Sequence, residues 1–538
     1  MGVYLNSKRP YTLYQAEASG EYFVDKTTML EELFPLIEQG GNYTCITRPR
    51  RFGKTITASM IGAFFGKEKD SRELFSQLKI ASSEKYKNHI NQHNIIYIAF
   101  NEAPTGCTSY KQYIDRIQKR LIGDLQREYP DCHADEDTAV WDILNDIYEL
   151  QSEVRFIFIF DEWDYIFHRD YVTEQDRKSY VEFLSNLLKN QPYVSYVYMT
   201  GILPIAKYSS GSELNMFLEY TMASEEKYCE YFGFTEEEVD ELFDRYSRLH
   251  MGKRSVTREG LRLWYDGYHT YSGGRVYNPR SVVASLSNNN LGNYWTSAGP
   301  YDEIFYYIEK NIDEIRDDIV LMVSGIPVSA KIREYAATSM NLTTRDEIFS
   351  AMVVYGFLSY ENGSVMIPNR ELMEKFEDML KKETSLGYVN RLAKLSEQML
   401  KATLSRDTKT MVEILENAHN TEIPLLSYNN ETELTALVNL VYLSARDFYR
   451  VEREDRAGKG YVDFIFYPQK NSAETGIILE LKIGKSPDDA IRQIKERGYA
   501  LQFCEKITGE TCYAGEILAV GITYDKNTKK HDCKVETL

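Results

Sequence analysis

Four continuous apolar runs in the first part of the chain predict the strands of a sheet. They are YTCIT (43–47), IIYIAF (95–100), VRFIFIF (154–160) and YVSYVYMTG (193–201). Such runs are typical of strands that are covered on both faces, because a solvated face would introduce alternating polar residues. Helical periodicity separates the runs, for example over residues 109–129 and 179–190. The alternation predicts an α/β fold, a parallel sheet with helices on both faces.

Other patterns predict the elements on either side of this region. Residues 1–40 predict a short strand and then a helix that ends at Gly40–Gly41. Beyond about residue 225, helical patterns dominate up to about residue 450. A β-like segment over residues 353–369 interrupts them, with Asn362–Gly363 as a predicted hairpin turn.

The last section of the chain mixes helical and strand patterns. It predicts helices over 431–446 and 488–504 and strands over 461–468, 476–483 and 516–524. We therefore expect four segments, which are an α/β domain over residues 1–224, a helical lid over 225–300, a mainly helical linker region over 301–425 and a second α/β domain over 426–538.

The loop after the first apolar run carries the first candidate chemistry. RPRRFGKT (48–55) lies between that strand and a predicted helix over 55–66, and it fits the P-loop pattern GxxxxGK[ST] except at Arg48. Backbone N–H groups and the helix N-terminus bind phosphate in such loops, and Gly53 permits close approach. Lys54 would reach the β and γ phosphates, and the Thr55 hydroxyl would bind Mg²⁺. The alternative is a chance GKT in a solvated arginine-rich loop.

The third apolar run ends in a pair of carboxylates. Asp161 would hold Mg²⁺, and Glu162 would act as the general base toward the attacking water. The alternative is an acidic helix cap after a core strand. Thr200, at the end of the fourth run, is a candidate sensor of the γ-phosphate. The expected nucleotide-binding residues are Arg48, Pro49, Arg50, Arg51, Phe52, Gly53, Lys54, Thr55, Ile56, Asp161 and Thr200.

A second candidate site lies near the C-terminus. Asp463 falls near the start of one predicted strand, and Glu480 and Lys482 share a face of the next strand. In a hairpin the two carboxylates would hold one or two divalent ions that activate water against a phosphodiester. Lys482 would orient the nucleophile or neutralise developing charge. The alternative is an exposed hairpin with Glu–Lys pairing across strands.

Several motifs together resemble the AAA-ATPase-like family that is common in anaerobic gut bacteria. They are YFVDKT, ITRPRRFGKT, FDEWD, TGILPIAKYSSGSELNMF and WYDGYHTYSGGRVYNPRSV. In that family an Arg-Pro-Arg-Arg loop replaces the usual first glycine. The resemblance, over about residues 5–300, implies ATP binding and a regulatory ATPase, and it identifies no arginine finger. Arg48, Arg50, Arg51 and Arg169 are the candidates.

The C-terminal carboxylates resemble the PD-(D/E)xK nuclease superfamily. The order of Asp463, Glu480 and Lys482 matches, and Gln493 and Tyr499 fit the pattern QIKxRxY on the following helix. The resemblance implies a restriction-endonuclease-like α/β fold and adds Glu433, on the preceding helix, as a further metal-site carboxylate.

Composition narrows the class of protein. Of 538 residues, 43% are hydrophobic and 27% charged, which is typical of a globular protein. The net charge of −18 argues against broad nonspecific coating of DNA but leaves room for a local basic cleft. No run approaches the ~20 apolar residues that cross a bilayer. The seven cysteines never form CxxC, which disfavours a disulfide framework or structural zinc. We expect a cytoplasmic protein.

The sequence therefore predicts an ATP- and Mg²⁺-dependent ATPase that is coupled to a metal-dependent nuclease acting on DNA or RNA. The alternative is a nucleotide-dependent switch or scaffold whose C-terminal domain binds nucleic acid or a partner without cleavage.

Overall fold

The computed structural model describes residues 2–135, 137–151, 154–205, 213–222, 225–295, 312–332, 342, 344–382, 386–420, 431–457, 460–469, 475–500, 503 and 515–538. The chain divides into two compact units. Unit 1 contains Met1–Ile304 and Ser329–Glu371, and unit 2 contains Phe305–Val328 and Leu372–Leu538. The four-segment division expected from the sequence stays a prediction.

The centre of unit 1 is a five-stranded parallel sheet in the order β2-β3-β4-β1-β5. Its strands are β1 (Asn42–Thr47), β2 (Asn94–Ala99), β3 (Phe156–Asp161), β4 (Val194–Gly201) and β5 (Leu218–Tyr220). Four of them coincide with the apolar runs. Nearly every residue of β1 to β4 is buried, as expected for strands that are covered on both faces.

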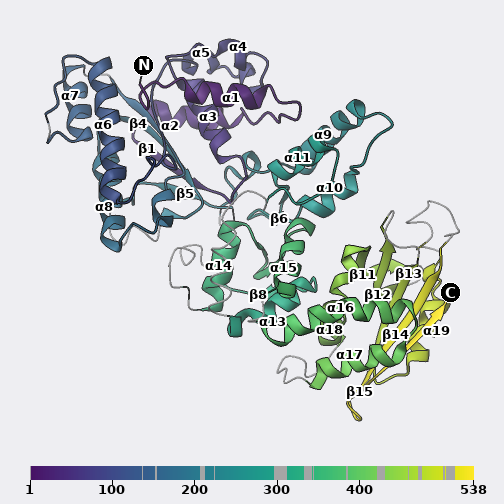
Figure 1. The fold of residues 1–538 in the computed structure, drawn as a ribbon. Helices are drawn as coiled ribbons and strands as arrows, with labels where there is room; N and C mark the ends of the chain where they lie inside the picture. The colour runs from purple at the N-terminus through teal and green to yellow at the C-terminus, as the bar shows by residue number, and fades with distance from the viewer. Residues whose placement is uncertain are drawn as a thin grey trace. The chain divides into compact units, whose positions relative to one another are not determined.

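Helices cover both faces of this sheet (Figure 1). Helices α2 (Met29–Gln39) and α3 (Lys54–Phe65) lie on one face, and α6 (Tyr110–Glu128), α7 (Val140–Leu150) and α8 (Glu174–Leu188) lie on the other. Side chains of β3 point alternately to the two faces of the sheet and so contribute to two separate parts of the core. Ile157 and Ile159 join the cluster with α2 and α3, whereas Phe160 packs against Phe100, which contacts Tyr180 of α8. The predicted α/β fold with helices on both faces is confirmed.

The N-terminal prediction needs correction. Residues 21–24 form no strand, and the described chain instead begins with α1 (Arg9–Ala18), which packs on α3. Pro10 at the start of α1 suits the first helical turn, where a missing N–H costs nothing. Short helices α4 (Arg72–Phe75) and α5 (Tyr86–His89) follow α3.

Residues 225–295 contain α9 (Glu236–Leu249), α10 (Arg258–Tyr265) and α11 (Pro279–Asn288), with the small hairpin of β6 (Tyr268–His269) and β7 (Arg275–Val276). Thr235, Thr257 and Asn278 cap the three helices. Unit 1 also holds α14 (Arg345–Tyr355) and the hairpin of β9 (Ser359–Glu361) and β10 (Ser364–Met366). Its turn residues Asn362 and Gly363 have φ values of 48° and 80°, which confirms the predicted turn.

Unit 2 combines helices with a mixed sheet in the order β11-β12-β13-β14-β15 (Figure 1). The strands are β11 (Tyr449–Ala457), β12 (Gly460–Pro468), β13 (Gly476–Ile483), β14 (Ile517–Asp525) and β15 (Lys530–Thr537). The helices are α13 (Ile312–Val323), α15 (Arg370–Lys382), α16 (Tyr388–Leu404), α17 (Thr408–Asn420), α18 (Glu431–Val441) and α19 (Pro487–Glu496). β12 and β13 are antiparallel, which confirms the predicted hairpin, whereas β13 and β14 are parallel.

Candidate active sites

A cavity of about 910 Å³ lies in unit 1 beside the carboxyl ends of the parallel strands. Its lining includes residues 50–56 of the P-loop, Glu162 and Asp164 after β3, Ile202 after β4, and Arg280 at the start of α11. Loops at the carboxyl ends of parallel strands meet at one sheet edge, which explains why distant segments converge here. The volume falls in the range of cofactor-binding sites.

The P-loop is shaped around Lys54. Gly53 has a left-handed φ of 90° at the N-cap of α3, and a Cβ there would meet no atom within 4 Å. The Lys54 side chain is buried, and its Nζ donates to the carbonyl oxygens of Arg48 at 2.9 Å and Pro49 at 2.8 Å. Burial lowers the pKa of Lys54 to about 8, and three nearby carboxylates, led by Asp164, oppose this change.

Asp161 and Thr55 meet beneath the P-loop. Burial raises the pKa of Asp161 to about 6, and a hydrogen bond with the Thr55 side chain opposes that rise. Asp161 is 1% exposed, and its buried Oδ1 atom has no hydrogen-bond partner in the described structure. A buried carboxylate oxygen without a donor is costly unless a cation fills its place. The pair therefore fits Mg²⁺, which prefers oxygen ligands.

Glu162 lines the cavity from a strained backbone position. Its φ is 52°, in the left-handed region that side chains other than glycine rarely adopt. Such strain is typical of functional loops, where the surroundings hold a residue in place. The turn directs Glu162 to the cavity, whereas the preceding Asp161 ends the strand.

Asp164 is a buried acid that the sequence analysis did not single out. Its Oδ2 accepts the N–H groups of Ile202 at 2.9 Å and Leu203 at 2.8 Å. The neighbouring Trp163 donates its ring N–H to the Leu203 carbonyl. These bonds tie the turn after β3 to the segment after β4. The second aspartate of FDEWD was the available signal.

Four predicted nucleotide-binding residues do not line the cavity, namely Arg48, Pro49, Thr200 and the buried Asp161 described above. The Arg48 guanidinium is buried, donates to the carbonyls of Thr47 and Tyr220, and lies over the Phe232 ring. Pro49 packs against Gly356 instead. The Thr200 hydroxyl donates to the Ile46 carbonyl at 2.8 Å. Arg48 and Thr200 thus satisfy backbone groups at the sheet edge rather than facing a ligand.

Other cationic side chains do line the cavity. Arg50 and Arg51 come from the P-loop, Arg169 from the turn after β3, and Arg280 from helix α11. The Arg169 guanidinium stacks 4.1 Å above the Tyr165 ring. Arg280 was missed, although it belongs to the YNPRSV segment. A cavity with cations on several walls favours a multiply charged anion.

The second site lies on the β12–β13 hairpin of unit 2. Phe464 pairs with Leu479 across the hairpin, so one further step in the same register places Asp463 opposite Glu480. Directly opposed residues of an antiparallel pair share a face of the sheet. The Asp463 carboxylate also accepts the Leu481 N–H at 2.7 Å. The structure therefore brings the two predicted carboxylates together.

Glu480 is the centre of a small polar network. Its Oε1 accepts from Lys482 Nζ at 2.7 Å and from the Gln493 side chain of α19, and Tyr499 hydrogen bonds with Gln493. The buried Oε2 has no hydrogen-bond partner in the described structure. Burial, aided by the charge of Asp463, raises the pKa of Glu480 to about 7.

Metal ligands beyond this pair are not defined. Glu433 lies in α18, but its side chain is outside the described residues. Among the described side chains, no three His, Cys, Asp or Glu residues group as metal ligands. The orphaned Oε2 of Glu480 beside Asp463 nevertheless fits a divalent cation, by the same reasoning as for Asp161.

Comparison with protein families gives the same two assignments. Residues 14–210 match the family described as "Predicted AAA-ATPase", and residues 430–532 match the PD-(D/E)XK nuclease superfamily. The chain joins an AAA-ATPase-like domain to a PD-(D/E)XK nuclease superfamily domain. The first match contains Lys54, Asp161 and Glu162, and the second contains Asp463 and Glu480. The AAA-ATPase-like and nuclease-like domains indicate the use of nucleotide and divalent metal in general.

Solved structures show weaker likenesses. A Walker-type ATPase of Pyrococcus abyssi is 14% identical, with 64% of this chain and 95% of that chain covered at a TM-score of 0.35. Drosophila ORC bound to DNA is 10% identical, with 68% and 91% covered at a TM-score of 0.27. No protein with a curated description matches the chain. Among the helices that the structure describes, none combines the length and apolarity needed to cross a membrane.

The contact between the two turns beside the AAA-ATPase-like site yields a stability prediction. A Cβ at Gly201 would lie 2.5 Å from Asp164 Oδ1 and 2.6 Å from the Trp163 ring. Because both side chains are buried and bonded, we expect Gly201→Ala to lower the free energy of unfolding by about 1–3 kcal/mol. Gly123→Ala, in the open interior of α6, should instead raise it by about 0.5–1 kcal/mol. Urea unfolding measures both, and equal stability of Gly201→Ala and wild type would contradict the packing.

The raised pKa of Glu480 yields a pH prediction for the metal-free nuclease-like domain. The folded state holds the proton up to about pH 7, whereas the unfolded chain releases it near 4.5. The contribution of Glu480 to the free energy of unfolding is therefore greatest below pH 4.5 and is lost as the pH rises toward 7, by about 2 kcal/mol. Unfolding free energies of the full chain in chelator, measured for wild type and Glu480→Gln, isolate this term. A difference between the two proteins that does not change from pH 4.5 to 7 would refute it.

Proposed function

We propose that the AAA-ATPase-like domain binds and hydrolyses ATP with Mg²⁺, and that the C-terminal domain is a metal-dependent nuclease acting on DNA or RNA. The observation that carries the first half is the convergence of Lys54, Thr55, Asp161 and Glu162 at one edge of the sheet, beside a cavity with cationic walls. The match to the AAA-ATPase family supports ATP rather than another nucleotide.

Each residue of the ATPase site has a separate task. Two of the three N–H groups of Lys54 are used by loop carbonyls, which leaves one for the β and γ phosphates. Arg50 of the P-loop and Arg280 of α11 neutralise phosphate charge. Glu162 accepts the proton of the water that attacks the γ-phosphate. Thr55 and Asp161 would hold Mg²⁺, which when bound neutralises charge on the phosphate oxygens.

The second half is supported by the opposed carboxylates on one face of the β12–β13 hairpin. Asp463 and Glu480 would hold a divalent cation, which when bound lowers the pKa of a coordinated water. Lys482, within hydrogen-bond distance of Glu480, would orient the nucleophile or neutralise charge on the phosphodiester. Gln493 keeps the Glu480 side chain in place through its amide.

One experiment separates this proposal from a switch that does not cut. The purified full chain is given Mg²⁺ or Mn²⁺ with linear, circular and single-stranded DNA and RNA, and ATP turnover is measured in parallel. ATP turnover together with cleavage of any substrate supports the proposal. ATP turnover and nucleic-acid binding without cleavage would replace the second half with a binding role.

A further inference from the structure

A buried carboxylate outside the matched ATPase segment lies close to the nucleotide cavity. Glu371, in the first turn of α15, is 1% exposed. Its Oε1 accepts from the Tyr294 N–H at 2.6 Å, the Trp295 N–H at 2.7 Å and the Ser281 hydroxyl at 3.0 Å. A buried charge persists only where donors surround it. The donors come from helix α11 and from the segment after it.

Trp295 links Glu371 to the P-loop through hydrogen bonds to both. Its indole N–H donates to the Arg50 carbonyl at 3.2 Å, and its ring packs edge-on against Phe357 at 4.9 Å. The next residue, Arg51, has a left-handed φ of 69°. A strained backbone of this kind persists only where neighbouring groups fix it. The Trp295 bond, at the carbonyl that precedes Arg51, supplies such support.

Ser281 links Glu371 to helix α11. It follows Arg280 on α11, and both Arg280 and the P-loop arginines line the cavity. The arginine side chains lie close enough for their charges to interact. Burial, together with the positive charges of Arg280 and Arg50, lowers the pKa of Arg51. The charge of Glu371 opposes that effect. Like charges gathered around a cavity favour an anion that neutralises them.

We propose that Glu371 and Trp295 act as a clamp of positioning residues, which holds the P-loop and α11 so that Arg50, Arg51 and Arg280 converge on the triphosphate. The inference rests on the proposed ATPase function and adds residues that neither matched segment contains.

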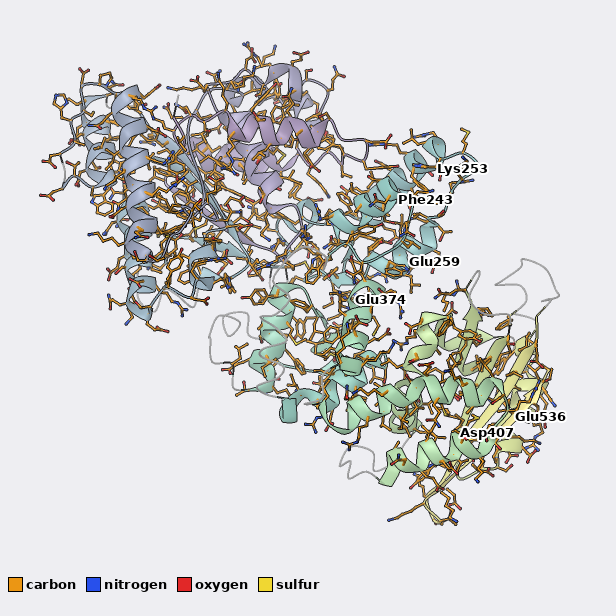
Figure 2. The ribbon with its side chains drawn as sticks, in the orientation of Figure 1. Phe243, Lys253, Glu259, Glu374, Asp407 and Glu536 are labelled. Atoms are coloured by element: carbon orange, nitrogen blue, oxygen red, sulfur yellow. The ribbon has the colours of Figure 1, made fainter. Side chains whose placement is uncertain are left out.

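Variants of the full chain test the clamp through kcat and KM for ATP. Glu371→Ala removes the shared acceptor, and Trp295→Phe keeps an aromatic ring, although a smaller one, but loses the bond to Arg50. We expect each to raise the KM for ATP about tenfold, because misplaced binding groups weaken the bound state. Glu371→Gln keeps an acceptor oxygen and should stay within about threefold of wild type. Matched controls are Glu259→Ala, an exposed residue of α10 (labelled in Figure 2), and Trp141→Phe on α7, and both should behave as wild type.

Thermal unfolding is measured to show that each variant is folded at the assay temperature. A purely structural role would lower the unfolding temperature without changing KM, whereas the clamp predicts a higher KM in the folded variant. ATP should also change the tryptophan fluorescence of wild type and Trp141→Phe, and the change should be smaller in Trp295→Phe, which keeps Trp163 beside the cavity. If Glu371→Ala does not fold, Trp295→Phe decides the matter. Folded Trp295→Phe with wild-type KM and fluorescence response would overturn the clamp alone. No ATP binding by wild type would overturn the ATPase proposal and the clamp together.

Discussion

Glu480→Ala is expected to lower metal-dependent cleavage of nucleic acid by at least about 10³-fold, equivalent to roughly 4 kcal/mol of transition-state stabilisation. The reason is that Glu480 and Asp463 form the only described carboxylate pair on this face of the β12–β13 hairpin, and a single carboxylate holds a divalent cation poorly. The rate is measured on a labelled linear substrate with Mg²⁺ or Mn²⁺. Asp463→Asn should show a loss of similar size.

The matched control is Glu536→Ala on β15 (labelled in Figure 2). Glu536 is paired with Lys495 and Lys534 at the surface and belongs to the same sheet. It should cleave at the wild-type rate. Cleavage that survives in Glu480→Ala, or that falls equally in Glu536→Ala, would show that the opposed carboxylates are not the catalytic centre.

Glu162→Gln is expected to keep ATP bound and to lower its turnover by about 10²–10⁴-fold, which is the usual range for loss of a general base. The amide fills the space of the carboxylate at the cavity but cannot take up a proton from water. Lys54→Ala should instead lose affinity as well as turnover, because the buried ammonium group is removed from the phosphate site. Steady-state kinetics and equilibrium binding of ATP, each with Mg²⁺, separate the two effects.

Glu259→Gln, at an exposed position of α10, is the control for charge removal, and it should leave both turnover and ATP binding unchanged. Equal turnover in Glu162→Gln and wild type would assign the general base to another group. Asp164 is the next candidate there, since it also lines the cavity.

The strands and both motif loops could be predicted from the sequence because they depend on local patterns. The apolar run at 154–160 became β3 (Phe156–Asp161), and the run at 193–201 became β4 (Val194–Gly201). The spacing of Asp463 and Glu480 across two short runs also gave the hairpin correctly. In each case burial on both faces leaves a signal in consecutive residues.

Side-chain directions and long-range contacts could not be predicted in this way. The sequence predicted Arg48 as a phosphate ligand, but its guanidinium donates instead to the Tyr220 carbonyl of β5, which pairs with β1. Glu371 gave no signal, because its donors lie more than 70 residues away in the chain. β11 and β15 were missed since their many charged residues hide the strand pattern.

The most direct test of the nucleotide site is a calorimetric titration of the full chain with ATP in the presence of Mg²⁺. Saturable binding at one site per chain, reduced beyond detection in Lys54→Ala, is the expected result. Failure of the wild-type chain to bind, or binding by Lys54→Ala with unchanged affinity, would contradict the assignment of a triphosphate to the cavity between residues 50–56 and Glu162.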